Sequence, residues 1–196
     1  MKRKFTAILC FLLLFFGLFS SAQNKYEREY RIRKIQFPKK ALGYIEEKLT
    51  NARRIRFYKE TDSLKISYEA KFKKDRLWYS IEFNQEGDLE DIEILIGAVD
   101  IPDEAFNSLK TYLSQYFKKY RIRKIQQQYP FTEGEPPEVT IKNAFQNLML
   151  PSINYELIVT GKKEKNFEQF EVLFDAEGNF KSIRKSLPPN YDHVLY

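Results

Sequence analysis

The sequence predicts an α+β protein made of two tandem repeats, each a helix packed on a four-stranded antiparallel β-meander. The first observation is that Phe37–Leu49 aligns with Ile101–Leu113, where a proline precedes apolar residues at helical spacing in both segments. The second is that Ile81–Ile94 aligns with Val172–Lys185, and each of these segments holds a glycine where a hairpin would turn. A helix and a meander are therefore expected to occur twice.

The strands are predicted from the alternation of apolar and polar residues. In Leu64–Lys73 and in Leu77–Phe83 every second residue is apolar, which is the period of a strand that buries one of its faces. Four further strands are predicted at Arg53–Tyr58, Tyr120–Ile125, Ile153–Val159 and Phe170–Phe174. Together with the glycine turns, these segments supply the two meanders.

The chain is expected to divide into three parts. Residues 1–22 have a basic start, an apolar run and a small-residue exit at Ser20-Ser21-Ala22, which is the layout of a signal peptide. The first repeat is placed at 23–98 and the second at 99–196, with an insertion at 127–152. The insertion opens with a loop rich in Pro, Gly and Glu, and the helical spacing of its later apolar residues predicts a short extra helix there.

Charge and cysteine content indicate the compartment in which the protein works and the classes of partner it can have. The formal charge of +6 includes three bases and no acid in residues 1–22, so the exported chain carries 6 − 3 = +3. The single cysteine, Cys10, leaves with the signal peptide, so no internal disulfide is expected. No later segment is apolar enough to span a membrane. We therefore expect a periplasmic or extracellular protein that has no transmembrane segment after signal removal and no nucleic-acid partner.

The sequence favours binding over catalysis. The only histidine is His193, near the chain end, so neither a Cys–His pair nor a Ser–His triad is expected. The segment Glu82–Glu93 has the spacing of a calcium loop, but it begins with Glu and its flanks are predicted strands, which favours an acidic hairpin. We expect no catalytic residue, no metal site and no cofactor.

The helix openings FPKKAL and IPDEAF and the hairpins FNQEGDLEDI and FDAEGNFKSI resemble those of PepSY-like, β-lactamase-inhibitor-like proteins. These are exported bacterial proteins often built from two such repeats. The resemblance implies binding, because related folds inhibit enzymes by docking a sheet face on them. No contact motif for a β-lactamase is recognisable in the chain.

The function predicted is that of an exported, non-enzymatic protein that binds or inhibits a protein or peptide in the cell envelope. The alternative is a small-ligand carrier with a pocket between helix and sheet. The insertion separates the two hypotheses. A lid over an apolar cavity would favour the carrier, and packing along a sheet edge would favour the binding module.

The predicted interface is the sheet face that points away from the helices. Strand alternation turns Trp78 onto this face, and amphipathic aromatics are typical interface anchors. The candidate interface residues are Trp78, Lys71, Glu69, Ser80 and Glu82 in the first repeat and Ile158, Glu171 and Leu173 in the second. The basic clusters at Arg53–Arg56, Lys71–Arg76 and Arg121–Lys124 are expected to be solvated strand faces, with an acidic partner or a phosphate-bearing surface as the alternative.

Overall fold

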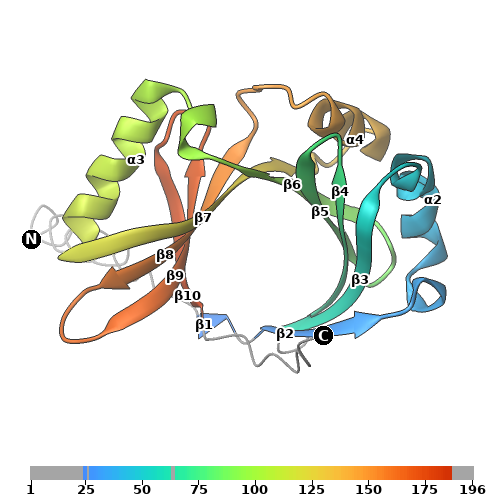
Figure 1. Cartoon of the computed structure of the whole chain (residues 1–196), viewed down its shortest axis with the longest axis horizontal. Coiled ribbons are helices and arrows are strands. Elements are labelled where there is room, and N and C mark those ends of the chain that lie inside the picture. Colours follow the sequence, from blue (N-terminus) through green and yellow to red (C-terminus); the bar gives the residue numbers. More distant parts are fainter. Residues whose placement is uncertain (1–23, 26, 63–64, 187–196) are drawn as a thin grey trace, which may run out of the picture.

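The protein forms one large sheet with helices on one side of it (Figure 1). The computed structural model describes residues 24–25, 27–62 and 65–186, so the predicted signal peptide lies outside the described residues. The strands are β1 Asn24–Lys25, β2 Glu27–Ile32, β3 Arg53–Asp62, β4 Lys65–Lys74, β5 Leu77–Asn84, β6 Leu89–Ile96, β7 Lys119–Pro130, β8 Asn154–Lys162, β9 Phe167–Asp175 and β10 Phe180–Ser186. The α-helices are α2 Lys39–Leu49, α3 Asp103–Tyr116 and α4 Pro137–Phe145, and two short 3-10 turns are η2 Lys34–Gln36 and η3 Ala98–Asp100. Each helix in the described part of the chain is too short or too polar to cross a lipid bilayer.

The sheet curls until its two edges meet. From β2 to β10 every strand runs antiparallel to the next, and β1 adds to β10 in parallel. β1 and β2 follow one another in the chain, yet they hydrogen-bond to opposite edges of the sheet, at β10 and at β3. The strands therefore enclose a ring, which Figure 1 shows from one end.

This architecture contradicts the prediction of two tandem repeats that are each a helix packed on a four-stranded antiparallel meander. β6 and β7 hydrogen-bond to each other along their length, with Ile92 opposite Tyr129 and Ile96 opposite Ile125. The strands before α3 and those after it therefore belong to one continuous, mostly antiparallel sheet. The two helix-plus-meander units expected from the sequence were wrong because they left out this long-range pairing and the strand β2.

The curvature of the sheet has a local cause. Register shifts interrupt the pairings β3–β4, β5–β6, β7–β8 and β9–β10. An extra residue in one strand of a pair bends that strand and increases its twist. Bulges spread over the sheet in this way favour a ring over an open, gently twisted surface.

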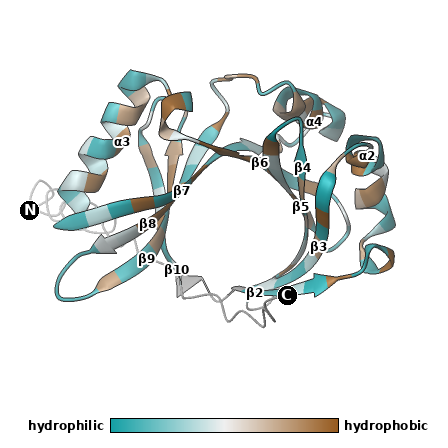
Figure 2. Ribbon diagram, viewed as in Figure 1, coloured by the Kyte–Doolittle hydropathy of each residue, from teal (hydrophilic) through white to brown (hydrophobic). Residues whose placement is uncertain are grey.

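The hydrophobic core lies between the outer face of the ring and the helices. α2 and α3 each follow a proline and bury one apolar face, with Ala41 and Ile45 in α2 and Leu109 and Leu113 in α3. Along the strands, buried apolar residues alternate with polar ones, as in the hydropathy pattern of Figure 2. The alternation leaves a polar face inside the ring.

The insertion adds a third helix to the outer face. Its first residues extend β7 to Pro130, and the predicted extra helix is α4. The ring of Phe145 stacks on that of Tyr79 with centroids 4.6 Å apart, and Ile141 and Ala144 are buried. The insertion therefore packs neither along a sheet edge nor over a cavity, and it closes part of the core.

Gly87 and Gly178 occupy corresponding hairpin turns, β5–β6 and β9–β10. Their φ angles are +83° and +80°, a region that L side chains rarely adopt. Each glycine also lies against the start of a helix, Gly87 beside Ala41 of α2 and Gly178 beside Ala105 of α3. The predicted turns are therefore present, and they also hold the helices on the sheet.

Candidate functional site

The inside of the ring is a polar cavity of about 400 Å³, which we call the lumen. It is formed by the strand positions that alternate with the core residues, so almost every lining side chain is charged or an amide. The acidic residues that line it are Glu29, Glu60, Glu69, Glu82, Asp91, Glu93, Glu156 and Glu171, and the basic ones are Lys71, Lys124 and Arg184. Acids outnumber bases, although the whole chain is basic.

The candidate interface residues lie together on this inner face. Glu69, Lys71, Glu82, Ile158 and Glu171 line the lumen. Ser80 and Trp78 are opposite Lys71 and Lys73 in the β4–β5 pairing, and Leu173 is opposite Glu156 in the β8–β9 pairing. The predicted face is thus a single surface, but it is concave, and Glu69, Ser80 and Glu171 are buried in it. Its role as an interface stays a prediction.

A buried ion pair stands at the centre of the β2–β5 side. The ammonium of Lys71 lies 2.6 Å from Glu69 and 3.0 Å from Glu29, and Ser80 donates a hydrogen bond to Glu69. Burial alone would raise the pKa of Glu69, but the Lys71 charge and hydrogen bonding with Glu60, Lys71 and Ser80 outweigh it and lower that pKa. Burial would lower the pKa of Lys71, and the charges of Glu69 and Glu29 raise it instead.

The same cluster bears on metal binding. Oxygens of Glu29, Glu60 and Glu69 lie within 4.8 Å of one another, close enough to share a cation. The Lys71 ammonium already contacts two of these three carboxylates. The positive charge that such a cluster needs is therefore supplied by the protein itself.

A second buried acid, Glu93 on β6, lies in a different electrostatic setting. It is 6% exposed and accepts a hydrogen bond from the amide of Gln126. Burial, followed by the charges of Glu156, Asp91 and Glu82, raises the pKa of Glu93 well above its ordinary value, and Lys124 only partly opposes this. The pKa shift of Glu93 is thus opposite in sign to that of Glu69.

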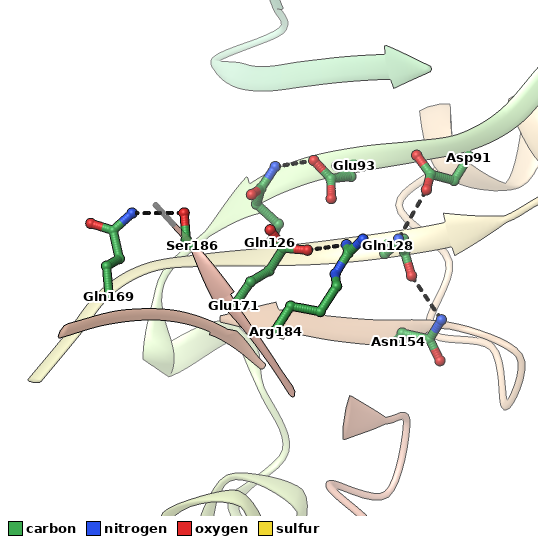
Figure 3. A network of polar contacts seen from close by, with 9 residues as sticks. All are labelled: Asp91, Glu93, Gln126, Gln128, Asn154, Gln169, Glu171, Arg184 and Ser186. Carbon is green, nitrogen blue, oxygen red and sulfur yellow. Dashed lines mark hydrogen bonds and ion pairs between the residues drawn. The ribbon is translucent and has the colours of Figure 1, made fainter. Parts of the chain in front are cut away.

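Amide hydrogen bonds and an ion pair join side chains from five strands on the far side of the lumen (Figure 3). Gln128 donates to Asp91 at 2.9 Å and accepts from Asn154 at 2.8 Å, which joins β6, β7 and β8. Arg184 on β10 pairs with Glu171 on β9. Because these side chains are held by neighbours on other strands, this part of the lumen wall is pre-organised.

One end of the lumen opens into a smaller cavity of about 200 Å³, which we call the mouth. The two cavities share Lys71, Glu93, Lys124 and Gln126. The mouth adds a set of basic and apolar side chains, namely Arg54, Arg56, Tyr58, Trp78 and Leu95. The sign of charge therefore changes from the lumen to its opening.

Sequence reasoning missed the acids contributed by β2, β3 and β6. Asp91 and Glu93 alternate with the buried Ile92 and Ile94, so strand periodicity placed them on the polar face. They carried no signal of a site, because acids on the polar face of a strand also occur where that face is simply solvated. Glu29 carried no such signal, since β2 was not expected to be a strand.

Comparison with known proteins shows the fold and no family. No family model and no curated protein sequence matches the chain. A DUF2874 family protein from Bacteroides ovatus is similar in structure with a TM-score of 0.50 and 11% identity, over 76% of this chain and 86% of that one. A protein from Bacteroides eggerthii described as periplasmic has a TM-score of 0.50 and 13% identity, over 76% and 88%.

A BLIP-like protein from Bacteroides fragilis has a TM-score of 0.49 and 12% identity, over 80% of this chain and 92% of that one. None of these three is described as a PepSY protein, and the single sheet is not divided into two helix-plus-four-strand repeats.

Proposed function

We propose that the chain is an exported, non-enzymatic binding protein that holds a segment of a protein or peptide partner in the lumen and its mouth. The observation that carries the proposal is the polar, pre-organised inner face of the ring, which opens to solvent through the mouth. A folded chain gains nothing in stability by lining a cavity with buried acids, because burying charge costs free energy even when the charge is paired. Such a surface is retained where a ligand uses it.

Export is supported by two observations. The first 22 residues have the layout of a signal peptide, and a structural neighbour is described as periplasmic. A non-enzymatic role is supported by composition, because the chain holds a single histidine, His193, and its single cysteine, Cys10, lies in the predicted signal peptide.

The structure gives less support to a carrier with a pocket between helix and sheet. That space is filled by Phe37, Ile45, Leu109 and other core residues. The lumen lies on the opposite face of the sheet, and its polar lining suits a charged or hydrogen-bonding segment better than an apolar small molecule.

The test is to fill the lumen without disturbing the core. Ile158→Trp places a tryptophan at a lumen-lining position, and Val139→Trp places one at an exposed position on α4. Both variants and the unchanged chain would be tagged, expressed with export in the producing cells, and their bound proteins quantified by mass spectrometry. We expect a protein that co-purifies with the unchanged chain to be lost with Ile158→Trp and kept with Val139→Trp. Equal retention by both variants would contradict binding in the lumen.

A further inference from the structure

We propose that the mouth recognises an acidic segment of the partner polypeptide, whose carboxylates bind between Arg54 and Arg56 on one wall and Lys124 on the other. This inference rests on the proposed function and names the chemistry of the partner at one end of the site. It follows from where the structure places basic residues that were expected, from the sequence, to lie on solvated strand faces.

The basic residues converge on one cavity from separate strands. Arg54 and Arg56 belong to β3 and Lys124 to β7, and the three strands between them curve around the mouth. Trp78 of β5 and Leu95 of β6 lie between the two basic walls, and Leu95 is 40% exposed. An anion on an aliphatic stem fits this arrangement, because the stem contacts the apolar groups while the charge meets the cations.

Two β-bulges place these cations. In β3 the register shifts between Arg53 and Arg56, and Arg54 has φ +56°, a left-handed conformation that costs a non-glycine residue about 1–2 kcal/mol. In β7 the register shifts between Ile122 and Lys124. Bulges commonly re-aim a side chain next to a functional site. The strained bulge at Arg54 brings its guanidinium 5.6 Å from the centre of the Trp78 ring.

The cations of the mouth keep their charge available. Within residues 24–25, 27–62 and 65–186, none of Arg54, Arg56 and Lys124 forms an ion pair with an acid. Lys71, by contrast, is neutralised by Glu69 and Glu29 deeper in the lumen. The lumen acids would repel a carboxylate of the partner. It would therefore bind at the mouth, where the three cations have no acidic partner in the described part of the chain.

The geometry favours a polypeptide segment over a lipid surface. The three cations line a concave cavity, whereas a bilayer presents its phosphates on a flat surface. A chain segment can enter the cavity with one or two carboxylates. Anionic lipid is therefore an outcome to be tested against.

The experiment uses Trp78, the only tryptophan in the chain, as a reporter inside the mouth. The probe is acetylated octaglutamate, which has no aromatic group, titrated into the full exported chain at low ionic strength. We expect a saturable change in Trp78 emission that weakens as salt is added, because salt screens exposed charges. Arg54→Gln/Lys124→Gln should weaken binding about tenfold, equivalent to about 1.4 kcal/mol. The matched control Lys39→Gln/Lys142→Gln removes the same charge from exposed positions on α2 and α4 and should bind as the unchanged chain does.

Three results would overturn the inference: equal weakening by both double variants, saturable binding of acetylated octalysine but not octaglutamate, or the same emission change with vesicles of anionic phospholipid. Failure of the inference is distinguishable from failure of the proposed function. Suppose that Ile158→Trp abolishes partner capture while Arg54→Gln/Lys124→Gln leaves capture and its affinity unchanged. The lumen would then bind the partner, but the mouth would not recognise an acidic segment of it.

Discussion

At the scale of single residues, the lumen shows how neighbours decide the charge of a buried acid. Glu69 and Glu93 are both buried on the inner face of the ring. Glu69 lies 2.6 Å from the Lys71 ammonium, which helps to lower its pKa, whereas burial and the nearby charges of Glu156, Asp91 and Glu82 raise the pKa of Glu93. Strand periodicity predicted that such residues share a face. It could not predict their pKa values, since these depend on side chains from other strands.

Glu93→Gln should stabilise the protein at neutral and alkaline pH. The folded-state pKa of Glu93 lies above the ordinary value of 4.5, so its contribution to stability is complete below that pH and is lost as pH rises through the folded pKa. Glutamine keeps the shape and the hydrogen bond with Gln126 but has no proton to lose. In urea unfolding between pH 4 and pH 9, the unfolding free energy of the variant should increase relative to that of the unchanged chain as pH rises. A control, Glu133→Gln, changes an exposed loop acid. Parallel pH profiles for Glu93→Gln and the unchanged chain would contradict the assignment.

At the scale of elements, the same heptapeptide adopts two structures. YRIRKIQ at 30–36 finishes β2 and continues as the turn η2, whereas the copy at 120–126 is strand throughout, within β7. The helices and most strands were predictable, because their apolar periodicity is local. β2 and the β6–β7 pairing were not, because they depend on hydrogen bonds between segments far apart in the chain.

The hairpin glycines give a prediction at this scale. In Gly178→Ala the new methyl group would lie 2.2 Å from the backbone oxygen of Ala105, at a φ of +80°. Because backbone strain and the clash with the start of α3 add, we expect a loss of about 3 kcal/mol in unfolding free energy. Gly134→Ala has a similar φ of +90° with no atom within 4 Å, so only strain applies and the loss should be about 1 kcal/mol. Thermal or urea unfolding of the two variants measures the difference, and equal losses would show that the contact with α3 does not matter.

At the scale of the whole molecule, closure of the sheet turns a polar face into an interior. The sequence identified that face and its tryptophan, but an alternating strand looks the same whether its polar side meets bulk water or a lumen. Closure depends on β1 and β2 hydrogen-bonding to opposite edges of the sheet, and no local sequence pattern predicts this pairing. The acidic lumen and the basic mouth exist only because the sheet closes into a ring. The expected binding place of a partner therefore also depends on this closure.

Site-specific photo-crosslinking tests the binding site most directly. A photoreactive benzoylphenylalanine would replace Ile158 in the lumen, Leu95 at the mouth, or Val139 on the outer face, in the full chain inside the cells that export it. We expect crosslinks to one and the same partner from the lumen and the mouth, and none to that partner from the outer face. Crosslinks from Val139 alone would show that the partner binds the helical side, and would contradict binding inside the ring.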